Sequence, residues 1–390
     1  MIEKLAMAIL TLGAALGTPQ LSALASVPLQ RVNPERLESG DILGLDDQLW
    51  DRAGQPGDRQ ALLAAIDNSL RYLETPAAAK AYQQYPAADI TRERVRKSLE
   101  RFRVLVSSSD SPAALQAAVR REFVFYRSEG RDGAGSVFFT GYYVPIYAAS
   151  PVPTPEYRYP LYRRPPDFEQ WPTPHPTRAE LEGRDGLQAS RGPLRGLELV
   201  WLRDRLEAFL VQIQGSAQLQ LADGRLMAVG YAGGTNYPYT SIGRELALDG
   251  ELKLDGLTMP VLIDYFRKYP AQLSEYLPRN NRFIFFRDTN GSPPMGSIQV
   301  PVTAERSIAT DKSLMPPGAL ALVRAKLPYH NAAGRIEQRT VSRYVLDQDT
   351  GSAIRGAGRV DYFMGTGQKA GERAGVTGST GQLYYLLLKE

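Results

Sequence analysis

The 390-residue chain contains no cysteine. This absence excludes disulfide bonds, thiol nucleophiles and zinc–thiolate sites. It also excludes the acylated cysteine of a lipoprotein, so we expect no covalent lipid anchor. Histidine is scarce as well: His175 lies in a proline-rich string, and His330 precedes a predicted turn. Neither has a partner at metal-ligand spacing or belongs to a Ser-His-Asp pattern, so any catalysis must depend on carboxylates, Tyr, Lys or Arg.

These absences predict a protein with no metal and no other cofactor, whose activity a chelator leaves unchanged.

Long blocks of like charge are missing too. The 46 Lys and Arg residues are interspersed with 42 Asp and Glu residues, for a net charge of +4, a pattern that predicts no nucleic-acid partner. Hydrophobic residues make up 43% of the chain, enough for a substantial core. The length favours about two or three domains, or one large domain with an insertion.

Residues 1–25 predict a signal peptide. Lys4 is followed by an apolar stretch over residues 5–16, and Ala23-Leu24-Ala25 supplies the small-x-small pattern read by signal peptidase. The apolar stretch is shorter than the roughly 20 residues that a membrane-spanning helix needs. We therefore expect an exported, periplasmic protein, soluble or peripherally associated with the outer membrane or the wall.

Helical periodicity marks the N-terminal part of the chain, from residue 33 to about residue 130. Apolar residues recur at a spacing of about 3.6 over residues 60–73, which predicts an amphipathic helix. Thr91 has the character of an N-cap for a second helix, and Ser111-Pro112 has the character of the start of a third.

From residue 137 onward, short apolar runs alternate with Gly, Pro and Asn turns, which is typical of β-structure. The strand-like runs are residues 137–143, 206–214, 218–221, 283–286, 298–302, 320–323, 342–346 and 383–388. A tight turn at Gly215-Ser216 is expected to join the second and third of these. Residues 260–276 predict an amphipathic helix with Leu262 and Tyr269 facing inward. The fold expected is mainly β with a helical N-terminal part.

Three aspartates lie beside glycine-rich turns near the end of the chain: Asp311, Asp349 and Asp361. An Asp side chain commonly accepts hydrogen bonds from backbone N–H groups two or three residues on, and this structural role suits Asp311 and Asp349. Asp361 instead follows a β-type residue and precedes two aromatic residues, which predicts a strand position beside apolar neighbours. Such surroundings raise the pKa of a carboxyl group, so Asp361 is a candidate proton donor.

These three segments resemble the C-terminal three-aspartate domain of the membrane-bound lytic murein transglycosylase A family. Upstream segments are similar to other blocks of that family. The similar segments are Phe139-Thr140-Gly141-Tyr142-Tyr143, Thr177-Arg178-Ala179-Glu180, residues 209–216 (FLVQIQGS), residues 231–243 and residues 367–375 (GQKAGERAG). Val144, Ala217 and the order of small residues at 232–236 depart from the family pattern, and none of these departures touches the three aspartates.

The resemblance implies a double-psi β-barrel split in sequence by an inserted, smaller β domain. We assign residues 33–144 and 288–390 to the barrel with its helical start, and residues 145–287 to the inserted domain. A groove between the two would hold a peptidoglycan strand, and proteins of wall synthesis are further partners for such a protein. Neutral hydrogen-bonding side chains suit the hydroxyl and N-acetyl groups of a sugar. The side chains expected in the groove are Thr140, Gln214 and Ser216.

The resemblance also implies an activity. The family cleaves the β-1,4 bond between N-acetylmuramic acid and N-acetylglucosamine, closing the muramic acid 6-hydroxyl onto the anomeric carbon to leave a 1,6-anhydro end. Asp361 matches the catalytic aspartate of the family, and Asp349 and Asp311 match its companions. Ordinary glycosidases need two carboxylates, but here one suffices because the hydroxyl of the substrate replaces water.

Three other interpretations remain open. Asp349-Thr350-Gly351 resembles the active-site motif of aspartic proteases, but that class needs two copies of the motif and the chain has one. A non-catalytic peptidoglycan-binding or wall-loosening protein on the same barrel is the stronger alternative, and the carboxyl at Asp361 argues against it. A role as a scaffold of wall-synthesis complexes is compatible with catalysis.

Overall fold

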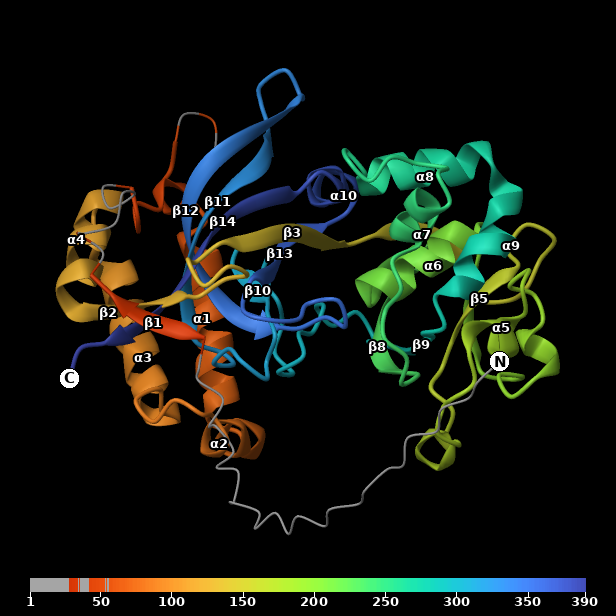
Figure 1. Ribbon diagram of the computed structural model, residues 1–390, viewed down its shortest axis with the longest axis horizontal. Helices are drawn as coiled ribbons and strands as arrows, with labels where there is room; N and C mark the ends of the chain where they lie inside the picture. Colours follow the sequence, from red (N-terminus) through yellow and green to blue (C-terminus); the bar gives the residue numbers. More distant parts are fainter. Residues whose placement is uncertain (1–27, 34, 36–41, 53, 55) are drawn as a thin grey trace, which may run out of the picture.

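Two β-sheets dominate the molecule, one in each of its two lobes (Figure 1). The computed structural model describes residues 28–33, 35, 42–52, 54 and 56–390. The predicted signal peptide, residues 1–25, lies outside the described residues. None of the helices within the described part has the length and apolar character that a membrane crossing requires.

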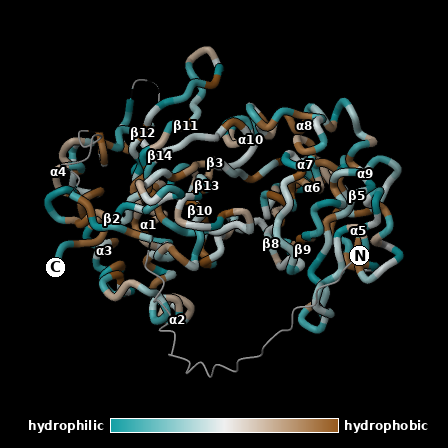
Figure 2. The backbone as a smooth tube through the Cα atoms, viewed as in Figure 1, coloured by the Kyte–Doolittle hydropathy of each residue, from teal (hydrophilic) through white to brown (hydrophobic). Residues whose placement is uncertain are grey.

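Four helices precede the second strand: α1 (Arg59–Leu73), α2 (Pro76–Gln83), α3 (Arg92–Ser108) and α4 (Pro112–Glu122). Thr91 and Ser111 cap α3 and α4, as predicted, because their hydroxyls accept hydrogen bonds from backbone N–H groups three residues on. Hydrophobic and hydrophilic residues alternate along α3 and α4, each of which buries one face (Figure 2). The expectation of helix to residue 130 is too long, because the apolar, aromatic run Phe123–Ser128 forms strand β2.

A closed barrel forms the first lobe. Its sheet contains β1 (Leu29–Val32), β2, β3 (Val137–Val144), β10 (Ser307–Ala309), β11 (Leu320–His330), β12 (Ile336–Asp349), β13 (Arg359–Thr366) and β14 (Gly378–Leu388). The order is β1-β2-β14-β11-β12-β10-β13-β3, and a further pairing of β14 with β3 closes a ring of six strands. Two pairs in the ring are parallel, β10 with β12 and β13 with β3. Helix α10 (Gln368–Gly375) packs against β3 and β13.

The second lobe follows β3 after a single residue, Pro145. Its sheet has the order β5-β6-β4-β7-β8-β9. The strands are β4 (Ile146–Ser150), β5 (Tyr159–Tyr162), β6 (Glu198–Leu202), β7 (Ser216–Leu221), β8 (Leu226–Gly234) and β9 (Ile284–Asp288). The helices are α5 (Arg178–Glu182), α6 (Arg205–Gln214), α7 (Ile242–Leu248), α8 (Met259–Lys268) and α9 (Leu273–Tyr276). Helix α6 shares one apolar cluster with the sheet and a second with α7, α8 and α9.

Three elements expected after residue 145 are wrong, two in the second lobe and one in the stretch that follows it. Residues 206–214 form helix α6 rather than a strand, because Asp204 caps its first turn and Gly215, at φ +78°, ends it in the left-handed conformation. The helix expected over residues 260–276 breaks after Lys268, since Pro270 cannot continue it, and Tyr269 is 44% exposed. Residues 298–302 form no strand beyond an isolated bridge at Pro301.

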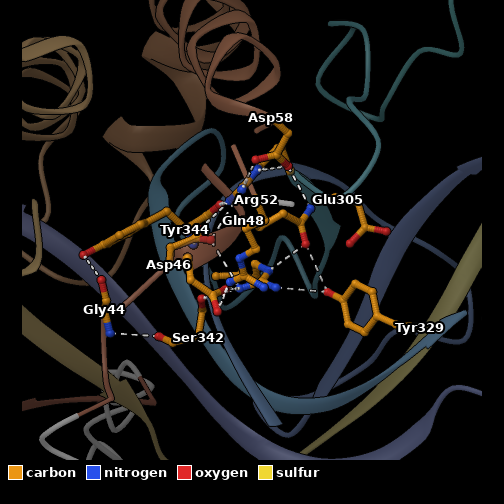
Figure 3. A network of polar contacts seen from close by, with 12 residues as sticks. Gly44, Asp46, Gln48, Arg52, Asp58, Glu305, Tyr329, Ser342 and Tyr344 are labelled. Carbon is orange, nitrogen blue, oxygen red and sulfur yellow. Dashed lines mark hydrogen bonds and ion pairs between the residues drawn. The ribbon is translucent and has the colours of Figure 1, made fainter. Parts of the chain in front are cut away.

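The described residues of the 42–58 segment (42–52, 54 and 56–58) are held against the barrel by an ion cluster around the buried Arg306 (Figure 3). Arg306, which has no exposed surface, forms ion pairs with both Asp46 and Asp58. The same guanidinium donates to the Tyr344 carbonyl at 2.9 Å, and Asp46 accepts from the Tyr344 N–H at 3.0 Å. Since every charge in the cluster faces an opposite charge, the cluster fixes this segment against the barrel wall.

Candidate active site

Asp361 lies within β13, between two neighbouring strands of the barrel, and the predicted strand position is confirmed. Its register partners are Thr140 on β3 and Ala309 on β10. Val360 and Tyr362, on either side of it in sequence, are fully buried in the barrel core. Because side chains alternate along a strand, Asp361 lies on the opposite, outer face of the barrel. It is partly exposed there.

The surroundings of Asp361 raise the pKa of its carboxyl group. Burial raises its pKa to about 6, and the nearby charge of Asp349 acts in the same direction. Two neighbours oppose this rise: the Thr140 hydroxyl donates a hydrogen bond to Asp361 Oδ1 at 2.8 Å, and the Arg359 guanidinium favours the charged form. The result is a carboxyl group that exchanges its proton in the mildly acidic to neutral range.

Asp349 ends β12 and is held by three donors. Its carboxylate accepts from the Tyr142 hydroxyl at 2.9 Å, from the Ser297 N–H at 2.9 Å and from the Thr350 N–H at 2.8 Å. Burial raises the pKa of Asp349, while these bonds and the charge of Lys312 oppose the rise. Tyr142 follows Thr140 by two residues on β3, so one strand supports both carboxyl groups.

Asp311 holds a loop. Its carboxylate accepts from the Ser313 N–H at 3.1 Å, the Ser313 hydroxyl at 2.6 Å and the Gly356 N–H at 2.9 Å. Burial opposes ionisation, but these hydrogen bonds and the neighbouring Arg355 bring the pKa of Asp311 below its usual value. Asp311 therefore joins its own turn to the segment that follows Asp349, in line with the turn-forming role that the sequence indicates.

Gln214 and Ser216 lie in the second lobe. Gln214 ends α6, and its Oε1 accepts from the Tyr143 N–H at 3.1 Å, which connects the helix to β3. Ser216 begins β7 opposite Gly230 and is partly exposed. The structure thus brings Thr140, Asp349 and Asp361 together by direct contacts or charge and links Gln214 to the same strand. Ser216 lies beyond this group, two residues after Gln214.

Sequence reasoning missed the parts that Tyr142 and Arg359 play. Tyr142 holds Asp349, and Arg359 lies two residues before Asp361 on the same face of β13. The period-two alternation of the two strands is the signal that could have found them.

A well-defined cavity lies elsewhere. It has a volume of about 420 Å³ and opens between the 42–58 segment and the barrel strands β11 and β12. Two arginines that line it already have carboxylate partners, Arg343 with Asp46 and Arg373 with Glu305. None of the three aspartates of the C-terminal segments lines this cavity.

The structure thus places a carboxyl group whose pKa is raised to about 6 near the charge of a second carboxyl group, on the partly exposed outer face of a barrel strand. The family model described as the MltA specific insert domain matches residues 138–287, and the model of the 3D domain matches residues 306–387.

The chain is also similar to whole proteins of this kind. It is 31% identical over 263 residues to membrane-bound lytic murein transglycosylase A of Escherichia coli K12, covering 67% of this chain and 68% of that protein. It is 31% identical over 264 residues to the protein of that name from Vibrio cholerae, with 67% and 68% covered.

Solved structures of lytic transglycosylases are also similar to this chain. The membrane-bound lytic murein transglycosylase from Agrobacterium tumefaciens superposes with a TM-score of 0.69 at 27% identity, covering 92% of this chain and 97% of that one. Lytic transglycosylase LtgG of Burkholderia pseudomallei superposes with a TM-score of 0.52 at 30% identity, with 94% and 97% covered. The chain belongs to the membrane-bound lytic murein transglycosylase A family, and it is an enzyme of the lytic murein transglycosylase class.

Proposed function

We propose that this enzyme cleaves the β-1,4 bond between N-acetylmuramic acid and N-acetylglucosamine in peptidoglycan and leaves a 1,6-anhydromuramic acid end, with Asp361 as the sole general acid/base. The observation that carries the proposal is the partly buried Asp361 carboxyl group, whose pKa of about 6 lets it give up and regain a proton near neutral pH. Membership of the transglycosylase family supports the reaction class.

The reaction starts with Asp361 protonated. Asp361 donates its proton to the glycosidic oxygen, the bond from that oxygen to C1 of muramic acid breaks, and N-acetylglucosamine leaves with a free 4-hydroxyl. The muramic acid 6-hydroxyl then bonds to C1 and gives its proton to the Asp361 carboxylate. No water is consumed, and Asp361 ends as it began. Because the attacking hydroxyl belongs to the same sugar, proximity supplies what a second catalytic group would contribute.

The companion residues act through Asp361 or on the glycan. Asp349, held by Tyr142, raises the pKa of Asp361 by its negative charge and so keeps it protonated before the first step. Thr140 orients the Asp361 carboxyl and, with Gln214 and Ser216, offers hydrogen bonds to sugar groups at the groove. Asp311 supports the loop after Asp349.

The same proposal covers architecture and location. We infer a double-psi barrel from residues 33–144 and 288–390 and an inserted domain from residues 145–287, with the glycan between them. The two parallel pairs in the ring of six strands and the separate second sheet support this division. The enzyme acts in the envelope, exported to the periplasm, with peptidoglycan and wall-synthesis proteins as partners.

Mass spectrometry of the products released from purified peptidoglycan sacculi tests the proposal. Muropeptides one water lighter than hydrolysis products, absent with Asp361→Asn, are expected. Fully hydrated ends would contradict the mechanism and make water the nucleophile. Binding to sacculi without soluble products would instead favour a non-catalytic peptidoglycan-binding protein.

A further inference from the structure

Two arginines stack on one aromatic ring beside the proposed catalytic carboxyl. The Arg131 guanidinium carbon lies 4.6 Å from the centre of the Phe138 ring, and that of Arg359 lies 5.1 Å from it. Arg131 comes from the loop between β2 and β3, whereas Arg359 begins β13. The ring therefore holds both cations in one place and limits their freedom.

This cationic pair shares the outer barrel face with Asp361. Arg359 is the register partner of Phe138 on β3, as Asp361 is of Thr140, so the two pairs are successive rungs of one face. Two residues along a strand separate them by about 7 Å. On the adjacent strand β14, Gly378 and Thr380 oppose Thr140 and Phe138, and both are exposed. The face is thus open to solvent beside both rungs.

The charges of the pair are poorly compensated. Among the described residues, neither arginine forms an ion pair with a carboxylate, and the Arg131 side chain donates only to the Gly358 carbonyl, at 3.2 Å. The two acids in the same loop have other partners: Asp132 accepts from the N–H groups of Ala134 and Ser136, and Glu129 accepts from the side-chain amide of Gln30. Asp361 is the one carboxyl group whose charge stabilises Arg359, while burial and the charge of Arg131 lower the pKa of Arg359. An anion placed here would relieve this repulsion.

We propose that Arg131 and Arg359 bind a carboxylate of the peptide attached to muramic acid, and so give the enzyme a preference for glycan whose peptides carry charged carboxylates over glycan whose peptides are neutral. The inference rests on the proposed function. Where a peptide is attached, the lactyl carboxyl of muramic acid forms an amide and the glycan backbone carries no charge, whereas the peptide carries free carboxylates close to the sugar whose C1 is attacked at Asp361. Guanidinium groups bind carboxylates through paired, charge-assisted hydrogen bonds, which suits this pair to that ligand.

The decisive experiment compares two substrates that differ only in charge: native peptide-bearing glycan, and the same glycan with its peptide carboxylates converted to neutral amides. Glycan stripped by an amidase is unsuitable, because stripping exposes the lactyl carboxylate of muramic acid. For the wild type, we expect kcat/KM to be about ten times higher on the native substrate than on the amidated one. In Arg131→Gln, we expect this ratio to fall about fivefold.

Controls separate binding from other effects. Arg335→Gln removes an exposed arginine at the distant β11–β12 turn and should leave the ratio unchanged. Arg131→Lys keeps the positive charge but loses the planar guanidinium group that can donate two parallel hydrogen bonds. Its ratio should therefore lie between those of Arg131→Gln and the wild type. Arg359→Gln should also lower the ratio, but it removes a charge that lowers the pKa of Asp361, so it is compared across a full pH profile.

The outcomes are distinguishable from those of the proposed function. Equal rates on both substrates in the wild type, or an unchanged ratio in both Arg131→Gln and Arg359→Gln, would overturn the inference while leaving the release of anhydro products intact. If neither substrate gave anhydro products, the proposed function would fail instead. Co-sedimentation of the full chain with native and amidated sacculi measures the same preference without catalysis: stronger binding to native sacculi, reduced in Arg131→Gln, supports the inference, and equal binding contradicts it.

Discussion

Thr140 and Asp361 are register partners on two parallel strands, and the Thr140 hydroxyl donates to Asp361 Oδ1 at 2.8 Å. Their strands begin 222 residues apart in sequence, at Val137 and Arg359. The barrel therefore fixes the position of the carboxyl group through backbone pairing, and the hydroxyl fixes its orientation.

Replacing the carboxyl group tests its role directly. Asp361→Asn keeps the shape and one hydrogen-bonding oxygen but cannot donate or accept the catalytic proton. We expect the rate of anhydro product release to fall at least about 100-fold, the lower end of what general acid/base groups contribute. The rate on sacculi measures this, with circular dichroism to establish folding. Asp311→Asn is the comparison: because Asp311 holds a loop, its loss should lower stability more than it lowers the rate of a folded enzyme.

The pH profile should follow the protonated form of Asp361. Since its pKa is raised to about 6, kcat/KM should decline as the pH rises above that value. The Thr140 hydrogen bond favours the charged form, so Thr140→Val should raise the pKa further and move the alkaline limb to higher pH. Profiles of both proteins between pH 4 and about 9 check this. A limb that moved to lower pH would contradict the assignment of the hydrogen bond.

The same carboxyl group should lower stability at neutral pH. Its pKa is about 6 in the folded protein against a usual value of 3.8. Between these values the folded state binds more protons than the unfolded state, so stability falls as the pH rises through this window and is level above it. We expect Asp361→Asn to be more stable than the wild type by about 1–2 kcal/mol at pH 7, with the difference vanishing near pH 4. Urea unfolding at the two pH values measures it, and an equal difference at both would refute the linkage.

The ion cluster behind the 42–58 segment should be essential for stability. Asp46→Asn removes the fully buried carboxylate that pairs with both Arg306 and Arg343, so these two buried guanidinium groups keep only the more exposed Asp58 and Asp47 as partners. We expect a loss of about 3–5 kcal/mol of unfolding free energy. The matched control is Asp67→Asn, whose partner Arg103 is 46% exposed, and which should lose less than about 1 kcal/mol. Similar losses of unfolding free energy in the two variants would show that burial does not determine how much the Asp46–Arg306 pair contributes to stability.

Local signals explain what the sequence could predict. The caps at Thr91 and Ser111 depend on residues within one turn, and Asp361 was identified by the apolar and aromatic residues beside it in the chain. Helix α6 was mistaken for a strand because its apolar residues dominated the pattern: its N-cap Asp204 was not considered, and Gly215 was interpreted as a turn between two strands rather than as the end of a helix.

Contacts between distant residues explain the rest. Asp46 and Arg306 are separated by 260 residues, and nothing in either neighbourhood marks them as partners. Tyr142 bonds Asp349 across 207 residues for the same reason. Packing of the segment before α1 against the barrel brings the first pair together, the strand order β12-β10-β13-β3 brings the second together, and no local pattern encodes either.

Strand β14 pairs with three other strands of the first sheet, β2, β3 and β11. Of the described strands it is the last to leave the ribosome. While β14 is still being made, the ring stays open and β3 has no neighbour on one side. Asp361 is then without its finished surroundings during synthesis. A chain truncated before β14 therefore leaves β3 unpaired beside Thr140, so the support of the Asp361 carboxyl group is complete only when the last described strand is in place.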